Sequence, residues 1–375
     1  MTSVLVLGTG LIGTSLGLAL SEAQDAAGRR YDVLLDDPDP AHLALAVSRG
    51  AGRRWEKQER ADVVVAAGPP GAIPGQLKAA QELDLAQTYT HACSVQSQVQ
   101  REVESLGCDL SSLVGGHPLA GRETSGPGGA RADLFLGRPW ALCPSSSSAA
   151  AAVRAVRELA QATGAVPVEL TASEHDRAVA VLSHLPQIVA SGLAGQLVRE
   201  GQTRPALRTE LSGPGLVDTT RLAASSPRLW TEILRANGAY VAPAVRALAD
   251  ELSSLAAALE ALTAGSSADP VALAAVDRFL TQGNEGRALV PVKRGVRDVG
   301  FALVAVTVDD RPGRLAALLT AAGQAGVNVE DVHVDHLPGR PTGVIDLLVG
   351  LESAALLERA LRAQGWQVRE SSAAS

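Results

Sequence analysis

Short apolar runs alternate with helix-like segments over the first 170 residues of the chain. The apolar runs are Val4–Leu7, Tyr31–Leu35, Asp62–Ala67, Thr88–Val95, Leu113–Gly115, Trp140–Cys143 and Val166–Leu170. Strands that are separated by helices are typical of a doubly wound parallel sheet. We therefore predict a Rossmann-type α/β domain over residues 1–170.

The pattern changes at Ser173, where apolar residues begin to recur at helical spacing. Ala and Leu dominate from there to about Gly265, without alternation of the β type. We predict an all-helical domain over residues 171–295 that binds substrate and forms a homodimer. Near its end, Gly265–Pro270 and Gln282–Gly300 have the composition of loops or linkers.

The final part of the chain returns to strand-like segments. These cover residues 301–308, 327–336, 342–350 and 366–370, and helical segments cover residues 312–325 and 354–363. The resulting order, βαββαβ, is that of the ferredoxin-like fold. We predict a third domain of this kind over residues 300–371.

Composition and charge limit the class of protein. A chain of 375 residues, 46% hydrophobic and 19% charged, is expected to form two or three globular domains. The net charge of -7, without a Lys/Arg-rich run, argues against a nucleic-acid partner. Three cysteines without a CxxC pair favour a reducing compartment. Because we find no apolar stretch of membrane-spanning length and the amino terminus leads directly into a strand, we expect a cytoplasmic protein.

A glycine motif, Gly8-Thr9-Gly10-Leu11-Ile12-Gly13, lies between the first strand and the first helix. Gly8 permits a tight turn, Gly10 lets a pyrophosphate approach the backbone, and Gly13 allows close packing of helix on strand. The helix N-terminus, at Leu11 and Ile12, then faces the phosphates. In this context the motif predicts a dinucleotide site rather than a plain glycine turn.

Acidic residues follow the second strand, in the segment Asp36-Asp37-Pro38-Asp39-Pro40. A carboxylate at this point accepts a hydrogen bond from the ribose 2'-OH and repels a 2'-phosphate. The sequence therefore favours NAD over NADP as the cofactor.

His117 lies in the segment Gly115–Gly126, which is too rich in Gly and Pro to predict a helix or a strand. Because ligands bind at the carboxyl ends of parallel strands, a loop imidazole at that edge is a candidate general base. The alternative is a histidine that only hydrogen-bonds the loop. Ser94, at another strand end, either orients the imidazole or the substrate hydroxyl, or is an ordinary turn residue.

Arg221 follows Asp218 in a mainly apolar neighbourhood, where an unpaired guanidinium would be costly. It therefore needs a partner, which is either Asp218 or an anionic ligand held by two hydrogen bonds. His184 interrupts the helical pattern and either faces the cleft or caps a helix. His175 and Asp176 are expected to be no more than a pair at a helix start.

No metal site is predicted. His333 and His336 are three apart on a predicted strand, which places them on opposite faces, and His42 and His91 have no ligand set at the right spacing. The sequence also lacks a GxSxG elbow and a Walker lysine, so hydrolase and kinase functions have no support.

Five segments resemble, in the correct order, the prephenate and arogenate dehydrogenase family of tyrosine biosynthesis. They are the Gly8–Gly13 motif, Cys93-Ser94-Val95, Gly116-His117-Pro118-Leu119-Ala120-Gly121, Ser183-His184-Leu185-Pro186 and Asp218-Thr219-Thr220-Arg221-Leu222-Ala223 with Trp230. The match covers about residues 1–295, and its HPxAG and DxTR segments are far more specific than the nucleotide motif.

The resemblance implies an NAD-dependent oxidative decarboxylation. Hydride leaves the ring carbon that bears the hydroxyl, and a base takes the hydroxyl proton. Loss of the ring carboxylate as carbon dioxide then gives 4-hydroxyphenylpyruvate from prephenate.

The family's residue roles carry over to matching positions of this chain. His117 is the proton acceptor, Ser94 its hydrogen-bonding companion, and His184 belongs to the second cleft motif. Asp37, rather than Asp36, binds the ribose. The residues assigned to the substrate are Arg221, which clamps a carboxylate, and Arg122, Gln187, Gly215 and Trp230.

Three positions depart from the family pattern. Gln96 stands where a lysine often follows the serine motif, Arg122 where a small hydroxyl residue is common, and Gln187 where many members have a second histidine. Because Gln187 faces the substrate side chain, the choice between prephenate and arogenate stays open. Arg122 adds a cation that would suit dianionic prephenate, which we take as the expected substrate.

The tail resembles an ACT domain, a regulatory module that commonly binds amino acids at subunit interfaces. Its marks are Asp310-Arg311-Pro312-Gly313 and Gly326-Val327-Asn328-Val329. We expect tyrosine to bind near Asp310, Pro312, Gly313 and Asn328 and to inhibit. The alternative is a module that only dimerises.

Two other function classes compete with this one. A β-hydroxyacid dehydrogenase shares the two-domain plan but uses a cleft lysine, and none of Lys57, Lys78 and Lys293 lies between Ser173 and Gly265. A catalytically silent sensor of NAD and an amino acid would use the tail as its working part. The joint presence of His117, Ser94 and Arg221 argues against such a sensor.

Overall fold

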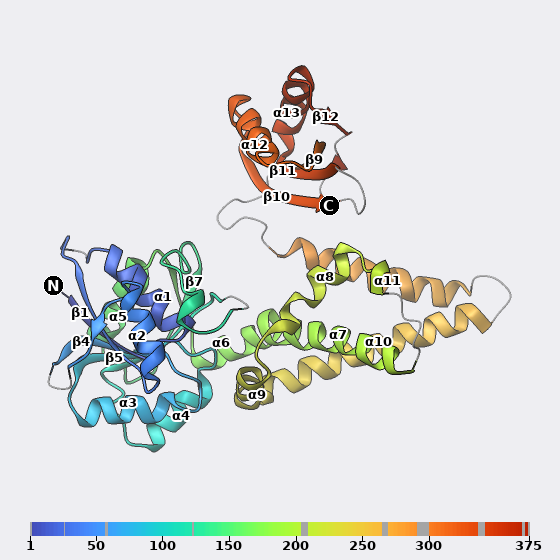
Figure 1. The fold of residues 1–375 in the computed structure, drawn as a ribbon. Helices are drawn as coiled ribbons and strands as arrows, with labels where there is room; N and C mark the ends of the chain where they lie inside the picture. The colour runs from blue at the N-terminus through green and yellow to red at the C-terminus, as the bar shows by residue number, and fades with distance from the viewer. Residues whose placement is uncertain are drawn as a thin grey trace. The chain divides into compact units, whose positions relative to one another are not determined.

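A computed structural model gives the structure of most of the chain. It describes residues 2–25, 27–56, 59–121, 124–203, 209–264, 269–290, 300–336, 342–369 and 372–373. The chain divides into two units, Met1–Phe279 and Leu280–Ser375, and each unit is described by itself (Figure 1).

The first unit contains an eight-stranded sheet with the order β3-β2-β1-β4-β5-β6-β7-β8. The strands are β1 Thr2–Leu7, β2 Tyr31–Asp36, β3 Arg53–Arg54, β4 Ala61–Ala66, β5 Ala86–His91, β6 Leu113–Pro118, β7 Pro139–Pro144 and β8 Val166–Glu169. Neighbours from β3 to β6 are parallel, which agrees with the expected Rossmann-type sheet.

The sheet is not wholly parallel, because β7 runs antiparallel to β6 and β8 is parallel to β7. The described part of the β6–β7 connection contains a short 3₁₀ turn, Pro127–Gly129, and no crossover helix. A parallel neighbour needs a crossover connection, whereas a looped chain can return antiparallel. The expectation of a purely parallel sheet is corrected at this strand.

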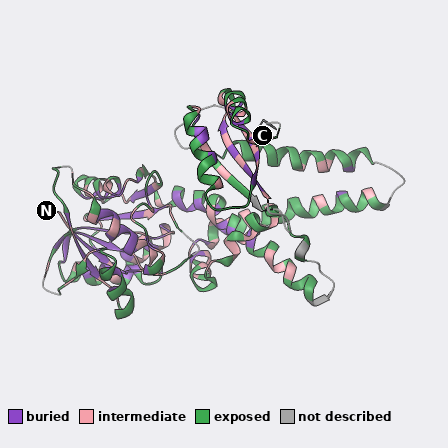
Figure 2. Ribbon diagram, turned by 45° about the horizontal axis from the view of Figure 1, so that its top comes forward, coloured by how far each residue is buried: buried purple, intermediate pink, exposed green. Residues whose placement is uncertain are grey.

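Helices cover both faces of the sheet and bury it. Their bounds are α1 Leu11–Glu22, α2 Pro40–Ser48, α3 Ile73–Glu82, α4 Ser97–Ser105 and α5 Ala150–Ala162. Val4 and Val6 pack in one core with α1, α2 and α5, whereas Leu5 points into a second core with α3 and α4. Figure 2 shows the buried strands between exposed helix surfaces. Burial on both faces explains the continuous apolar run Val4–Leu7 within β1.

From residue 172 to residue 288 the described residues form helices and helical turns joined by short connections, and the last helix crosses the boundary between the two units. The elements are α6 Ala172–Val179, a π-helical turn Ala180–His184, α7 Leu185–Thr203, a 3₁₀ turn Thr209–Leu211, α8 Pro214–Thr220, a 3₁₀ turn Arg221–Ala224, α9 Pro227–Ala236, α10 Gly238–Ala264 and α11 Pro270–Ala288. The expected helical domain is therefore present.

α11 overlaps the linker expected at Gln282–Gly300. The first seven residues of that expected linker are helical, which corrects the prediction there. Gly283, Asn284 and Gly286 favour loops when they are judged locally. The helix instead continues from a start at Pro270, where the Asp269 side chain accepts from the Val271 N–H at 2.9 Å. Of the other expected linker, residues 265–268 lie outside the described residues.

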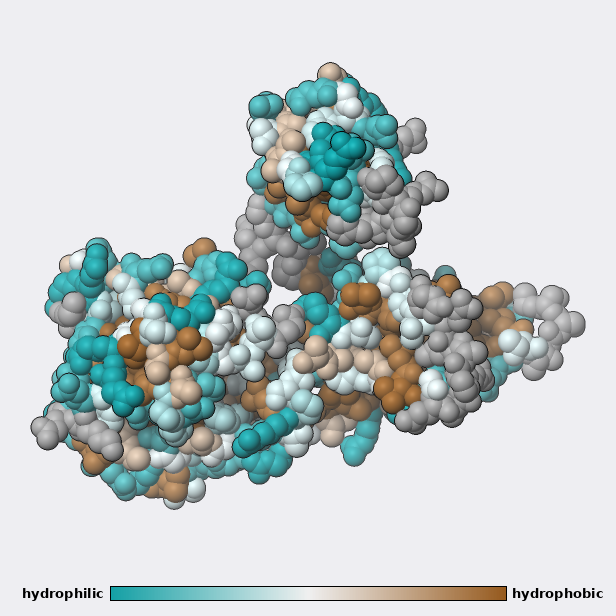
Figure 3. Space-filling view, in the orientation of Figure 1, coloured by the Kyte–Doolittle hydropathy of each residue, from teal (hydrophilic) through white to brown (hydrophobic). Residues whose placement is uncertain are grey.

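The helical part of this unit exposes many apolar side chains. Leu182 is 74% exposed, Leu211 80% and Val271 76%. Apolar side chains are visible on this surface in Figure 3. A surface of this kind on a helical domain is typical of one that packs against a partner.

One described helical run, Ala172–Gly201, is long and apolar enough to cross a membrane by length and composition alone. The sequence does not predict this run, because Ser183, His184 and Pro186 interrupt its apolar residues. In the structure the helical backbone continues through these three positions. Only 28% of its most apolar window is buried. The run carries His175 and Asp176, each 1% exposed, and these two polar side chains belong to the interior of this unit.

The second unit has a five-stranded antiparallel sheet beside two helices. The elements are β9 Phe301–Asp309, α12 Arg314–Gln324, β10 Val329–His336, β11 Thr342–Gly350, α13 Leu351–Ala363, β12 Gln367–Val368 and β13 Ser372–Ala373. The order is β10-β11-β9-β12, with β13 also paired to β9. Leu318 of α12 and Leu357 of α13 pack on Val304, Val306 and Leu347 of the sheet. The short strand β13 was not expected from the sequence.

We predict that Gly17→Ala destabilises the first unit. A Cβ atom at Gly17 of α1 would lie 2.2 Å from the Ala51 carbonyl oxygen. Alanine adds about 1 kcal/mol of helix propensity, but overpacking against backbone costs about 1–3 kcal/mol. The thermal unfolding midpoint of Gly17→Ala should therefore fall.

Gly75→Ala is the matched control, because Gly75 lies in α3 with open space around its Cβ position. Its midpoint should stay the same or rise slightly. Equal midpoints for the two variants would contradict the packing argument.

Candidate active site

The glycine motif forms a tight turn between β1 and α1. Gly8 has a φ of 107°, a conformation that glycine adopts without strain. A Cβ atom at Gly13 would lie 1.9 Å from the Gly8 carbonyl oxygen, so the helix can pack here only with glycine. Gly10 has no heavy atom within 4 Å of its Cβ position. The turn therefore leaves open space at its middle glycine and none at the third.

α1 begins directly after Gly10, which has no side chain to cap it. The backbone N–H groups of Leu11 and Ile12 therefore receive no acceptor from the N-cap residue. Such N–H groups, together with the helix dipole, favour an anion. A phosphate could approach them over Gly10.

The carboxylate of Asp37 lies against the same turn. It accepts hydrogen bonds from the N–H and the hydroxyl of Thr9, the latter at 3.0 Å. Asp36 contributes its backbone carbonyl, which accepts from the Gly8 N–H at 2.8 Å. Of the two acids, Asp37 is thus the one whose carboxylate is placed beside the glycine turn.

His117 lies on strand β6, not in a loop as the sequence analysis expected. Its backbone pairs with Ala141 of β7. A Cβ atom at Gly115 would lie 2.4 Å from Gln96 Oε1, and one at Gly116 would lie 2.6 Å from the His91 carbonyl oxygen. Gly115 and Gly116 are therefore needed for close packing of this strand rather than for a turn.

A chain of hydrogen bonds runs from His117 into the protein interior. His117 Nδ1 lies 2.8 Å from His175 Nε2, and His175 Nδ1 lies 2.9 Å from Asp176 Oδ1. His117 is half-buried, whereas His175 and Asp176 are each 1% exposed. The imidazole expected to be catalytic is thus linked to a buried carboxylate through a second imidazole.

Asp176 also binds the N-terminus of α4. Its two carboxylate oxygens accept from the backbone N–H groups of Gln96, at 2.8 Å, and Ser97, at 2.7 Å. Burial alone would raise the pKa of Asp176, but the hydrogen bonds from His175, Ser97 and Gln96 outweigh it and lower that pKa. The carboxylate therefore stays ionised in the interior.

Asn237 connects this chain of hydrogen bonds to His184. Its Nδ2 lies 2.9 Å from the Asp176 carbonyl oxygen and 3.1 Å from His184 Nδ1. His184 is 1% exposed, and its ring meets the edge of the Trp230 ring at a centroid distance of 5.8 Å. The structure thus brings His184 and Trp230 into the same network as His117.

Burial keeps the imidazoles of His91, His117 and His184 neutral near pH 7. It lowers the pKa of His91 to about 4 and that of His184 to about 4. The pKa of His117 falls well below its usual value because of burial and the neighbouring rings of His175, His184 and His91, although Asp176 opposes the shift. A neutral His117 can accept a proton near pH 7.

Gln96, which replaces the usual lysine of the serine motif, holds the β5–α4 loop to β6. Its Nε2 donates to the carbonyl oxygens of Cys93, at 2.8 Å, and Gly116, at 3.2 Å. Ser94 is half-buried in that loop. His117 Nδ1 is engaged by His175. Nε2 is therefore the ring nitrogen left for a contact with Ser94.

The residues assigned to substrate binding are less closely grouped than His117, His175 and His184. Gln187 is buried in α7, and its Nε2 donates to Ser191 Oγ at 3.2 Å. Arg221 and Gly215 are exposed on the helical part of the unit. Arg122 lies outside the described residues.

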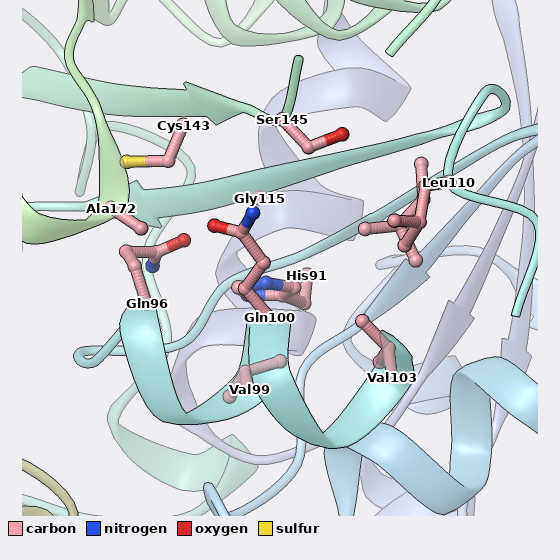
Figure 4. Close-up of a pocket in the computed structure, with 11 residues that line it drawn as sticks. His91, Gln96, Val99, Gln100, Val103, Leu110, Gly115, Cys143, Ser145 and Ala172 are labelled. Atoms are coloured by element: carbon pink, nitrogen blue, oxygen red, sulfur yellow. The ribbon is translucent and has the colours of Figure 1, made fainter. Parts of the chain in front are cut away.

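A small pocket lies beside Gln96, between α4 and the ends of β5, β6 and β7 (Figure 4). Its lining includes His91, Gln100, Gly115 and Cys143. His117, Ser94 and His184 do not line it, so we do not assign the substrate to this pocket. The described residues also contain no group of three or more metal-ligating side chains.

Sequence reasoning missed the roles of His175, Asp176 and Asn237. The signal available was a capping box, Thr171 with Glu174, which fixes the start of α6 and places His175 and Asp176 in its second turn. Because helix starts are common, this signal does not indicate that His175 and Asp176 lie close to His117. Asn237 ends α9 and carries no local signal at all.

The chain is similar to known proteins over most of its length. A family model described as prephenate dehydrogenase, nucleotide-binding domain, matches residues 20–169, and a second, prephenate dehydrogenase, dimerization domain, matches residues 171–268. A probable prephenate dehydrogenase NovF from Streptomyces niveus is 36% identical over 98% of this chain and 99% of its own length.

The chain belongs to the prephenate dehydrogenase family. Two solved structures share its fold. The Aquifex aeolicus prephenate dehydrogenase, in complex with hydroxyphenyl propionate and NAD+, has a TM-score of 0.66 and 24% identity, covering 77% of this chain and 98% of its own. Synechocystis arogenate dehydrogenase has a TM-score of 0.58 and 23% identity, covering 76% and 99%. The nucleotide-binding domain and the NAD+-bound relative agree with the predicted cofactor, NAD.

We predict that Gly10→Ala impairs NADH binding without affecting the fold. The new methyl group would occupy open space in the free protein but would block a pyrophosphate from the backbone. The Kd for NADH, measured by fluorescence, should rise by about tenfold or more, and the thermal midpoint without NADH should not change.

Gly71→Ala is the control, because Gly71 also has open space at its Cβ position but lies outside the glycine motif. An unaltered Kd in Gly10→Ala would rule out the proposed approach of the cofactor over this residue.

Proposed function

We propose that this family member is an NAD-dependent prephenate dehydrogenase, which converts prephenate to 4-hydroxyphenylpyruvate by oxidative decarboxylation. The observation that carries the proposal is the neutral, half-buried His117, whose Nδ1 is engaged by His175 and whose Nε2 is the nitrogen left for a substrate proton. In the oxidation, a hydroxyl must lose its proton as the ring carbon loses hydride. A neutral imidazole is suited to take that proton.

The cofactor site comprises Gly8, Gly10, Leu11, Ile12, Gly13 and Asp37. NAD, when bound, supplies the hydride acceptor. The backbone at Gly10 to Ile12 meets the pyrophosphate, and Asp37 accepts from the ribose hydroxyls. The position of Asp37 beside Thr9 supports this assignment.

The substrate is placed by residues of both the sheet and the helices. His117 accepts the hydroxyl proton, and Ser94 hydrogen-bonds that hydroxyl or the ring. Arg221 binds a carboxylate, for which its guanidinium has the matching charge and geometry. His184, Gln187, Trp230 and Gly215 line the substrate side, with Arg122 as a further cation.

Prephenate and arogenate differ in the side chain that we place near Gln187. Prephenate carries a keto acid there, whereas arogenate carries an amino acid with an ammonium group. Gln187 is uncharged, so it provides no carboxylate to pair with an ammonium, and Arg122 would favour the dianion. Both features support prephenate, with arogenate as the alternative substrate.

The helical domain forms a homodimer in this proposal. The exposed apolar residues Leu182, Leu211 and Val271 support it, as does the description of the family model that matches residues 171–268. We assign residues 1–170 to the cofactor, 171–295 to substrate and dimerisation, and 300–371 to regulation. We place the enzyme in the cytoplasm.

The regulatory assignment is an ACT domain that binds tyrosine. The antiparallel sheet with two helices, in the order β10-β11-β9-β12, supports a ferredoxin-like fold. Gly313, with a φ of 86°, precedes α12 and has no side chain to cap it, and Asn328 lies immediately before β10. Asp310, Pro312, Gly313 and Asn328 would bind the amino acid, and the alternative is a module that only dimerises.

We predict that wild-type protein reduces NAD with prephenate and that His117→Ala lowers the rate by about a hundredfold to ten-thousandfold, because the proton acceptor is removed. NADH formation is followed by absorbance. The control is His42→Ala, whose imidazole is exposed on α2 and should leave the rate unchanged.

Arogenate, in the same assay, tests the choice of substrate. A faster reaction with arogenate would replace prephenate as the substrate. No NADH from either compound would favour the silent sensor instead.

We predict that tyrosine inhibits the full-length enzyme and that Asn328→Ala weakens the inhibition by about tenfold without changing the uninhibited rate. Asn328 Nδ2 is 2.6 Å from Glu330 Oε1, and the substitution removes that amide from the turn. Inhibition is measured as the tyrosine concentration that halves the rate. Unaltered inhibition would favour the module that only dimerises.

A further inference from the structure

We propose that His175 and Asp176 are positioning residues that fix which nitrogen of His117 carries its proton and stabilise the proton that His117 takes from substrate. The proposal rests on the proposed function for its catalytic part. It rests on the contacts from His117 Nδ1 to His175 Nε2, 2.8 Å, and from His175 Nδ1 to Asp176 Oδ1, 2.9 Å.

The order of donors and acceptors follows from the carboxylate. An ionised Asp176 can only accept, so His175 must carry its proton on Nδ1. When that is its only ring proton, His175 has a bare Nε2, which can only accept from His117 Nδ1–H. Neutral His117 is left with its lone pair on Nε2. A single buried charge thus sets the tautomer of two imidazoles in series.

The carboxylate is well placed for this role because its surroundings keep it charged. It is 1% exposed and accepts from the N–H groups of Gln96 and Ser97 at the start of α4. Hydrogen bonds to the charged form, together with a helix N-terminus, stabilise a buried anion. Asp176 therefore has no need of a cation as a partner.

The proton transfer involves only the substrate hydroxyl and the side chains of His117, His175 and Asp176. The substrate O–H bond breaks and a new N–H bond forms at His117 Nε2. The proton on His117 Nδ1 can then shift to His175 Nε2, which places the positive charge beside Asp176. The hydride leaves separately to NAD, so no other oxidant is needed.

Other titratable groups also act on His117. His91 faces it from β5 and His184 from the π-helical turn, and both of these rings are buried and neutral near pH 7. Among the described groups that perturb His117, Asp176 is the anion. Its loss is therefore expected to weaken the base further, not to strengthen it.

His175→Gln separates the proposed role from the capping of α4, because it leaves Asp176 and its two backbone contacts in place. We expect kcat with prephenate to fall by about tenfold or more, with the Kd for NADH within about twofold of wild type. His42→Gln is the matched control and should behave as wild type.

Asp176→Asn tests the charge itself. Because His117 must be neutral to act, kcat/KM falls as pH falls through its pKa. Removing the negative charge lowers that pKa, so the acid limb of the pH profile should move to lower pH while kcat at neutral pH falls. A residue that only caps α4 would leave the acid limb in place.

A measurement on the wild-type enzyme needs neither turnover nor a folded variant. Ring-nitrogen NMR of the free protein, labelled with 15N-histidine, should show His117 with its proton on Nδ1. A proton on Nε2 overturns the proposal even if the enzyme is active. Unchanged kcat and pH profile in folded His175→Gln and Asp176→Asn also overturn it. Absence of turnover in wild type would instead contradict the proposed function.

Discussion

The contact between the Asp176 carboxylate and the first turn of α4 is the interaction on which the site depends. Asp176 belongs to α6, the first helix after the sheet, and α4 is one of the helices that cover the sheet. One buried anion therefore joins the helical part of the unit to the part that contains the sheet. The same anion holds His175, and through it His117. Because an unpaired buried carboxylate would be very costly, the helical part cannot shift here without breaking several hydrogen bonds together.

A catalytic imidazole on a strand differs from one on a loop. His117 is held by pairing with β7, and its neighbour Gly116 is packed against the backbone of β5, so its backbone has little freedom. Precise placement of a base favours proton transfer. In the proposed function, adaptation to the substrate would fall to residues of the helices, such as Gln187 and Arg221, rather than to His117.

Local patterns in the sequence were sufficient for much of the fold. The apolar runs marked the strands because burial on both faces demands them, and the Gly8–Gly13 motif could be interpreted from sterics alone. Three features depend on contacts with residues distant in the sequence, which a local pattern does not predict. They are the direction of β7, the continuation of α11 and the exposure of Arg221. For the same reason His175 and Asp176 were taken for an ordinary helix start. They lie 58 and 59 residues from His117 and meet it only in the folded chain.

The π-helical turn Ala180–His184 has a consequence for how this region can evolve. Its wider winding accommodates one residue more than an α-helix would, and one residue corresponds to a rotation of about 100°. His184 turns inward to Asn237, while Leu182 points outward. Because the extra residue is absorbed within the turn, loss of a single residue here would restore regular winding and keep α6 and α7 in similar register, but it would change which side chain faces Asn237. A change of length in this turn would therefore displace His184 from Asn237, whereas a substitution at the outward-pointing Leu182 would not.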